Sequence, residues 1–212
     1  MDRIDKILNH DLFLYHLGRN NAAEADRRFC RHGMVHFLDV ARIGTIIALE
    51  EGLKIDREWI YAAALLHDCG KHEQYEIGIP HEQASVRIAP EILKDCGFND
   101  EETGVIVTAI SRHQDPEAAK EKNLNGILYR ADKASRACFA CDVEKDCNWK
   151  DGKKNLTIKY LIGVGNIINN INKCGEKTNE DWQQRVSDQR TYLCNGDPEC
   201  DPGFFFRRRK VE

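Results

Sequence analysis

Histidine and acidic side chains recur in this sequence on helical faces that are otherwise apolar. His36, His113 and Asp132 each continue a row of apolar residues spaced three or four positions apart, the spacing that lines one face of a helix. His67 follows an apolar run at the end of another expected helix. Burying these groups without partners would cost on the order of several kcal/mol. A cation among them would satisfy all four together, so the pattern predicts a metal site.

The adjacent pair His67-Asp68 restricts the geometry of such a site. Neighbouring side chains on a regular helix diverge by about 100°, so both can reach one ion only where the helix tightens or ends. Cys69-Gly70 follows directly and provides that end. Taken singly, an inward histidine is more often a hydrogen-bonded core residue than a ligand, and it is the joint pattern that favours metal binding.

Helices must position these side chains. Apolar residues recur three and four apart from Ile4 to about Trp182 with no convincing strict alternation, which predicts an all-α bundle. Asn99 and Glu102 have the spacing of a capping box. The expected helices cover residues 2–18, 22–31, 34–51, 56–70, 81–97, 99–113, a segment that aligns Leu124, Leu128 and Asp132, and 156–173. Loops 72–80 and 114–123 interrupt the ligand-bearing helices and are expected to form the walls of the pocket.

The composition excludes several classes of protein. A chain of 212 residues with 42% hydrophobic residues can bury one sizeable core. The net charge of −4 offers no broad cationic face, so we expect neither nucleic-acid nor membrane binding. No leader or membrane-spanning pattern is evident, which gives the expectation of a cytoplasmic protein. A homo-oligomer is compatible with the sequence.

The predicted organisation is one helical domain with a cysteine-rich C-terminal extension. Residues 1–137 are expected to form the helical domain, and residues 138–174 a cysteine-rich loop with a packing helix. Residues 175–212 contain Gly, Pro and Asp around two cysteines and are expected to be weakly structured.

The residues around the predicted ligands resemble three motifs of the HD superfamily of metal-dependent phosphohydrolases. The motifs are HFLDVAR at 36–42, LLHDCGK at 65–71 and RADK at 130–133, and the resemblance covers roughly residues 27–137. It implies an all-α HD-domain helical bundle. Six ligand types in the right order on the right helices make this a specific signal.

The resemblance also implies two neighbouring metal positions. The first ion would be held by His36, His67, Asp68 and Asp132. Asp68 would bridge to a second ion bound by His81 and His113, the arrangement in similar diadenosine polyphosphate hydrolases. His32 lies one turn before His36 and is a rival for that role, but only His36 is followed by the rest of the motif.

These implied ligands point to hydrolysis of a phosphate ester or anhydride in a small phosphorylated, nucleotide-like substrate. Nitrogen and carboxylate ligands suit one or two divalent ions, with Fe, Mn, Zn, Ni and Mg all open, and such ions lower the pKa of bound water to near 7. Asp68 and Lys71 are the expected catalytic residues, with Lys71 placing a cation against phosphate. The alternatives are a non-catalytic HD-fold regulatory module that binds metal or nucleotide, and an HD enzyme that uses its metals for oxidation.

Nine cysteines form an odd set that cannot all pair within the chain. Cys138, Cys141 and Cys147 follow a C-x2-C-x5-C pattern that could hold zinc or a cluster, the fourth ligand coming from Cys174, Cys194, Cys200 or another chain. Half-buried thiols that simply pack into a lysine-rich loop are the simpler alternative. The other cysteines, Cys30, Cys69 and Cys96, are expected to be core residues. His10, His16 and His72 show no evident partners.

Overall fold

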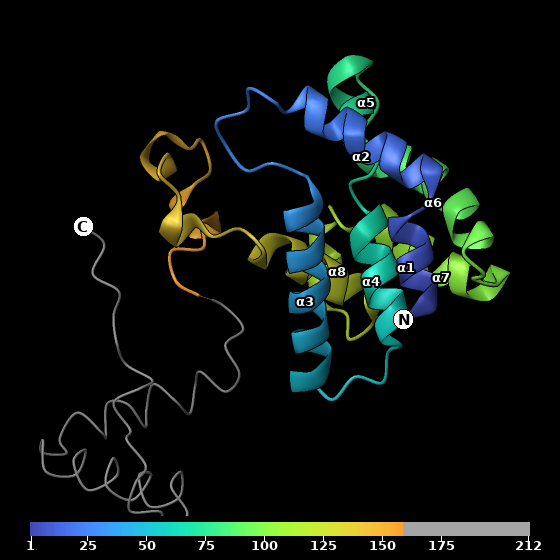
Figure 1. The fold of residues 1–212 in the computed structure, drawn as a ribbon. Helices are drawn as coiled ribbons and strands as arrows, with labels where there is room; N and C mark the ends of the chain where they lie inside the picture. The colour runs from blue at the N-terminus through green and yellow to red at the C-terminus, as the bar shows by residue number, and fades with distance from the viewer. Residues whose placement is uncertain (159–212) are drawn as a thin grey trace, which may run out of the picture. The chain divides into compact units, whose positions relative to one another are not determined.

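The computed structural model describes residues 1–158, to which the following account is confined (Figure 1). The part of the predicted helix 156–173 beyond residue 158 and the whole extension 175–212 lie outside the described residues. Within residues 1–158 all regular structure is helical, as the periodicity predicts. The helices are α1 (Asp2–Leu8), α2 (Asp11–Ala23), α3 (Met34–Glu50), α4 (Arg57–Leu66), α5 (Lys71–Glu76), α6 (His81–Asp95), α7 (Asp100–Arg112), η1 (Pro116–Lys120), α8 (Leu124–Ala134), η2 (Cys138–Ala140), η3 (Glu144–Asp146) and η4 (Asp151–Lys153).

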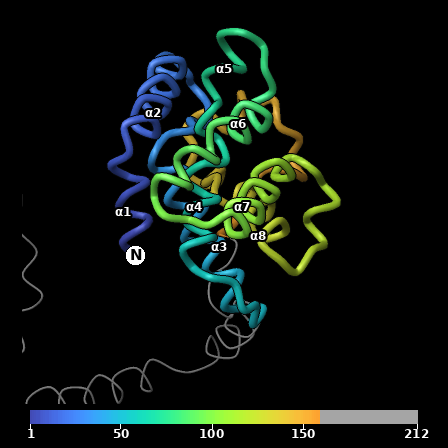
Figure 2. The backbone as a smooth tube through the Cα atoms, turned by 90° about the vertical axis from the view of Figure 1, so that its right-hand side faces the viewer, coloured from blue at the N-terminus to red at the C-terminus, as the bar shows by residue number. Residues whose placement is uncertain are grey.

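The core forms where α3, α4, α7 and α8 pack against one another. α3 contacts α4 on one side and α8 on another, and α7 contacts both α4 and α8. Figures 1 and 2 show α6 beside α7, with α5 joining α4 to α6. The largest fully buried side chains include Phe37, Leu66, Ile106 and Ile127, one from each of these core helices. This packing brings helix ends from distant parts of the chain to one region.

Local capping fixes the starts of several helices. The Asp56 carboxylate accepts a hydrogen bond from the Glu58 amide at 2.7 Å, which starts α4. The predicted capping box is present at α7, where Asn99 and Glu102 each accept a hydrogen bond of 2.9 Å from the other's backbone N–H. Such caps depend on neighbours in sequence, which is why these starts are predictable.

Two predicted helices are wrong in their extent. The expected helix 2–18 is divided into α1 and α2, because the His10 ring accepts a hydrogen bond from the Leu12 amide and caps a new helix. The expected helix 22–31 does not form, since residues 24–33 are non-helical. There the Glu24 carboxylate binds the backbone N–H and the ring of His32 across the loop. The expected loop 72–80 begins with the short helix α5.

None of the helices within residues 1–158 combines the length and hydropathy needed to cross a bilayer.

Candidate metal centre

The six predicted ligands lie at helix ends or on inward helix faces, and their side chains are buried. α4 ends at Leu66, so His67 is its C-cap and Asp68 belongs to the following turn. This placement frees the two neighbouring side chains from the divergence that a continuing helix would impose. The other four occupy the first turn of α3, the first residue of α6, the C-cap of α7 and the inner face of α8: His36, His81, His113 and Asp132.

The structure brings the six side chains into two groups that share one residue. The first ligand group is His36, His67, Asp68 and Asp132, and the second ligand group is Asp68, His81 and His113. Within each group the ligand atoms lie within 4.8 Å of one another.

In the first ligand group, imidazole nitrogens converge on carboxylate oxygens. His36 Nε2 lies 3.3 Å from His67 Nε2, 3.6 Å from Asp68 Oδ2 and 3.5 Å from Asp132 Oδ1. His67 Nε2 lies 3.2 Å from Asp68 Oδ2. Ligand atoms at ~2.1 Å from one ion and about 109° apart, as in a tetrahedral site, are separated by ~3.4 Å, so these distances match neighbouring vertices of a coordination shell.

In the second ligand group, His81 Nε2 and His113 Nε2 lie 3.1 Å apart. Both approach the other oxygen of the shared carboxylate, since Asp68 Oδ1 is 3.2 Å from His81 Nε2 and 3.6 Å from His113 Nε2. Each oxygen of Asp68 therefore faces a different group of imidazoles, which is the arrangement of a bridging carboxylate.

Hydrogen bonds at the Nδ1 atoms fix the orientation of these imidazoles. His67 Nδ1 donates to the Ala64 carbonyl at 2.8 Å, and His113 Nδ1 donates to the Ile110 carbonyl at 2.6 Å. With the proton held at Nδ1, the Nε2 atom keeps its lone pair and points it into the site.

His36 and His81 are anchored in the same manner, but by side chains. His36 Nδ1 lies 3.2 Å from the Ser135 hydroxyl, which itself donates to the Asp132 carbonyl. His81 Nδ1 lies 2.6 Å from Gln74 Oε1 on α5. All four imidazoles therefore turn Nε2 lone pairs toward one another, an arrangement that a cation between them would stabilise.

Two buried carboxylate oxygens support the same conclusion. Asp68 Oδ1 and Asp132 Oδ1 are buried and receive no hydrogen bond from any residue in the described range 1–158, although such atoms are nearly always paired in native proteins. Burial opposes ionisation of Asp68, yet the surrounding imidazoles lower its pKa well below the usual value. The carboxylates are thus negative and require positive charge within reach. The donor set of imidazole nitrogens and carboxylate oxygens fits one or two divalent ions.

The two ligand groups differ in their electrostatics. Burial favours neutral His67, but attraction to Asp68 and Asp132 outweighs it and raises its pKa, which reports the negative potential at the first ligand group. Burial lowers the pKa of His81 to about 3, against the attraction of Asp68. His81 is therefore neutral at pH 7 with its lone pair available.

Lys71, the predicted phosphate-binding cation, lies next to the second ligand group. Its Nζ atom is 3.2 Å from His81 Nδ1 and 3.5 Å from Gln74 Oε1. Burial lowers its pKa against the attraction of Asp68. The expected wall at 114–123 also reaches the site through Gln114, whose Nε2 atom is 3.4 Å from His81 Nε2.

Two further cations approach Asp132 from the end of α8, and the sequence analysis did not single out their role. Lys133 Nζ lies 2.7 Å from Asp132 Oδ2, and Arg136 Nη2 lies 3.5 Å from Asp132 Oδ1. The guanidinium of Arg136 stacks 4.7 Å from the ring centroid of Trp149, and its buried Nε has no hydrogen-bond acceptor. Arg136 lies two residues beyond the end of α8, but its four-residue spacing from Asp132 could still have indicated that the two side chains are near each other.

His32, the rival to His36, lies at the edge of the first ligand group. Its Nε2 atom is 4.0 Å from Asp68 Oδ2, while its Nδ1 atom is 2.6 Å from Glu24 Oε1. The Tyr75 hydroxyl also donates to Glu24 Oε1 at 2.6 Å. Burial alone would raise the pKa of Glu24, but the bonds from His32 and Tyr75 lower it to about 2.

The expectation that His10, His16 and His72 lack partners is wrong. His16 Nδ1 lies 2.8 Å from His72 Nε2, and their stacked rings join α2 to α5. Together with Glu73 they form a third group of adjacent ligand types. His10 caps α2 and lies 3.4 Å from Asp95. The contacts of His16 with His72 and of His10 with Asp95 join residues more than 50 positions apart. Patterns of neighbouring residues in the sequence therefore could not predict them.

Comparison with known proteins agrees with this geometry. The family model described as HD domain matches residues 33–137, a range that holds all six residues of the two ligand groups. An uncharacterized protein of Clostridium beijerinckii is 48% identical over 160 residues, which cover 76% of this chain and 100% of that protein. No solved structure shows a significant match. From its helical fold, its His/Asp centre and this match, the chain contains an HD domain over residues 33–137.

Proposed function

We propose that the chain is a metal-dependent phosphohydrolase acting on a phosphate ester or anhydride of a nucleotide-like substrate. The observation that carries the proposal is the position of Asp68, whose two oxygens face separate groups of imidazoles at 3.2 Å. Divalent ions bound there would supply a water of lowered pKa and offset charge on the phosphate.

The residues of the chain have distinct roles in this proposal. The first ligand group, namely His36, His67, Asp68 and Asp132, would hold one ion, and Asp68 would share its carboxylate with a second ion held by His81 and His113. The backbone carbonyls and side chains bound at the Nδ1 atoms keep these imidazoles in the required orientation.

The cations around the centre support phosphate as the group that reacts. Lys71 lies beside the second ligand group, and Arg136 and Lys133 lie beside the first. Arg136 has the planar fork of donors that suits phosphate oxygens, and its Nε has no hydrogen-bond acceptor among residues 1–158. A phosphate placed between these cations would be held from both sides and neutralised as charge develops in the transition state.

The likeness to diadenosine polyphosphate hydrolases rests on the presence of both middle histidines, His81 and His113. It makes dinucleoside polyphosphates one part of the substrate panel, beside nucleoside mono-, di- and triphosphates. A non-nucleotide phosphate ester belongs in the same panel, because the cations recognise phosphate and not the base.

The test is a metal-dependent assay of the purified chain. After chelation, the protein is reloaded with Mn, Fe, Ni, Zn or Mg and release of phosphate or nucleotide is measured over the panel. Asp68→Ala should lower the rate of phosphate or nucleotide release by about 100-fold or more and reduce the number of bound ions. Asp39→Ala is the control, since that carboxylate pairs with Arg42 on α3, away from the two ligand groups. Absence of turnover with every metal would contradict the proposal and favour a binding module.

A further inference from the structure

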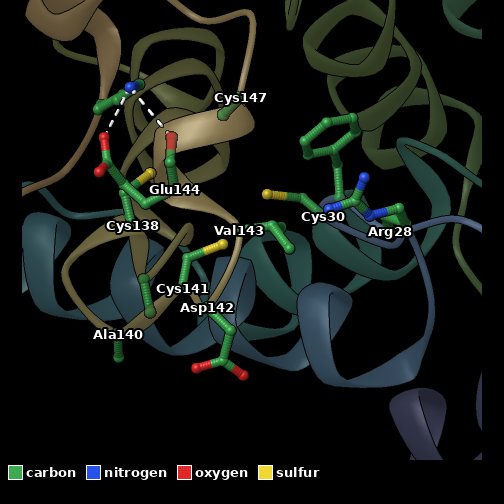
Figure 3. A pocket seen from close by; sticks show the side chains of 12 residues that line it. Arg28, Cys30, Cys138, Ala140, Cys141, Asp142, Val143, Glu144 and Cys147 are labelled. Atoms are coloured by element: carbon green, nitrogen blue, oxygen red, sulfur yellow. Dashed lines mark hydrogen bonds and ion pairs between the residues drawn. The ribbon is translucent and has the colours of Figure 1, made fainter.

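Four cysteine side chains from two distant parts of the chain line one pocket of about 390 Å³. Cys30 comes from the loop between α2 and α3, whereas Cys138, Cys141 and Cys147 come from the segment after α8. Figure 3 shows the thiols of Cys30 and Cys141 pointing into the space between the two segments. The expectation that Cys30 is a core residue is therefore wrong, since it is only half-buried and faces this pocket.

The segment that carries three of these cysteines lacks a hydrophobic core of its own. Among residues 137–158 the only buried residue is Asn155, no apolar side chain is buried, and the regular structure consists of three-residue turns. A segment of this kind gains little stability from apolar burial, and a disulfide or a metal is the usual means of stabilising one. All four thiols of the pocket are free in the structure.

We propose that Cys30, Cys138, Cys141 and Cys147 form a four-thiolate zinc site, separate from the histidine and aspartate centre. Four thiolates in a tetrahedron are a standard structural zinc site, and the two-residue spacing between Cys138 and Cys141 is typical of one arm. Zn²⁺ would displace the thiol protons and leave a net charge of −2 on the site. Arg28 and Lys154 line the same pocket, where they offset the carboxylates of Asp142 and Glu144.

Ion binding must draw the thiols closer together. Among residues 1–158, the groups of three or more ligand atoms within 4.8 Å of one another consist of histidines and carboxylates. A cysteine Sγ moves by rotation about one bond, χ1, so closure requires rotamer changes and small shifts of the half-buried loop. Because Cys30 lines the pocket with the other three cysteines, we assign the fourth ligand to Cys30 and not to Cys174, Cys194 or Cys200.

This site would clamp two segments that flank the HD centre. Cys30 lies two residues before His32, and Cys138 lies two residues after Arg136. The segment is already tied to α8, because the Asn155 amide donates to the carbonyls of Lys133 at 2.7 Å and Arg136 at 3.0 Å. Arg28 also pairs with Asp146 at 2.8 Å. A zinc ion would join both segments at the side of the centre where Arg136 approaches Asp132.

The test uses cobalt as a spectroscopic substitute for zinc in the full-length, reduced protein. Cobalt bound by thiolates gives intense near-ultraviolet charge-transfer bands, whereas cobalt bound by imidazole and carboxylate does not. We expect these bands in the wild type and in Asp68→Ala, which separates this site from the proposed phosphohydrolase centre. Zinc should abolish the bands by displacement.

Variants then identify the ligands. Cys30→Ser and Cys141→Ser should each weaken zinc binding by more than the roughly 10–100-fold that loss of an outer partner causes, and Cys30→His should restore binding with weaker charge-transfer bands. Cys96→Ala, buried at the end of α6, and the combined Cys174→Ser, Cys194→Ser and Cys200→Ser variant should match the wild type.

Several results would overturn the proposal. A wild type without thiolate bands at saturating cobalt excludes the site, and unchanged bands in Cys30→Ser exclude Cys30 as a ligand. If the purified protein contained iron with acid-labile sulfide, the site would be an iron–sulfur cluster and the assignment to zinc would be wrong. A disulfide between any two of the four thiols, found by mass spectrometry of freshly purified protein, would also exclude the zinc site.

Discussion

Asp68 is the residue on which both ligand groups depend, and its environment extends beyond the ligands. Glu24 and His32 lie behind it, and neither belongs to the two ligand groups. The Glu24 carboxylate accepts three hydrogen bonds of 2.6 Å, from the His32 backbone, the His32 ring and the Tyr75 hydroxyl. Such charge-assisted bonds are stronger than neutral ones. Glu24 therefore fixes the loop that carries His32 and directs its ring toward Asp68.

Glu24→Gln should destabilise the fold by about 2–4 kcal/mol at pH 7, because the amide cannot accept all three bonds. The pKa of Glu24 is about 2 in the fold against the ordinary 4.5, so its stabilising effect is complete above pH 4.5 and is lost as the pH falls toward 2. Urea unfolding at pH 7 and pH 3 should show the wild-type advantage shrinking at the lower pH. Glu50→Gln, at an exposed position on α3, is the control, and an equal loss in both variants would contradict the prediction.

Arg136→Ala should lower kcat/KM for the phosphorylated substrate by about 10-fold or more, the effect of one charge-assisted hydrogen bond. Arg136→Lys should recover only part of this, since an ammonium lacks the planar fork and the stacking against Trp149. The measurement is steady-state kinetics with a metal-loaded protein. Lys145→Ala, exposed in the same segment, should behave as wild type, and an unchanged Arg136→Ala would remove this residue from the phosphate site.

At the scale of elements, what could be predicted from the sequence is what local pattern determines. The capping box of α7 and the bounds of α3 follow from residues near in sequence, and the resemblance to HD phosphohydrolases gave the six residues that converge. The break at His10 is a local cap that helical periodicity does not reveal, whereas the non-helical run 24–33 and the helix α5 also depend on contacts with distant residues, Tyr75 and Asn20 respectively. The pairing of Arg136 with Trp149 and of Glu24 with Tyr75 is tertiary in the same way, so the sequence carried no local signal for it.

Close contact between α5 and α6 also positions the second ligand group. Gly70 precedes α5, and a Cβ atom there would lie 2.5 Å from Ala84 Cβ and 2.8 Å from the Ser85 backbone nitrogen. The Gly70 amide donates to the Ser85 hydroxyl at 3.0 Å. This approach sets the distance between Asp68 and His81, the first residue of α6.

Gly70→Ala should therefore destabilise the fold by ~1–3 kcal/mol through overpacking and weaken binding of the second ion more than the first. Gly104→Ala is a matched control inside α7, where an added Cβ would meet nothing within 4 Å, and it should stabilise the helix by ~0.5–1 kcal/mol. Thermal unfolding and metal titration check both effects. Loss of both ions in equal measure would contradict the proposed role of this contact.

Over the whole molecule, the buried carboxylates couple metal binding to stability. Asp68 and Asp132 are 2% and 1% exposed, and each has one oxygen that receives no hydrogen bond within residues 1–158. Burying these negative charges lowers the stability of the fold, and a bound cation would offset that loss. Because the ligands come from α3, α4, α6, α7 and α8 and the turn between α4 and α5, an ion would hold most of the bundle together.

Divalent metal should therefore raise the melting temperature of chelated protein. At a free metal concentration 100 times Kd, the gain in unfolding free energy is about 2.7 kcal/mol per independent site. The measurement is calorimetry with and without manganese, and the gain should fall sharply in Asp68→Ala and persist in Asp39→Ala. An equal rise in all three proteins would show that the metal acts elsewhere.

Asn20 supports the turn that carries Asp68, although it lies outside the segment matched by the HD-domain family model. Its fully buried amide donates to the Asp68 carbonyl at 2.8 Å and accepts from the His72 amide at 2.7 Å, yet it lies outside the matched range 33–137. The turn that presents Asp68 is thus braced by a residue of the N-terminal helices. An excised HD segment would lose this brace along with Glu24 and His32, so mutational surveys and expression boundaries should begin at α1.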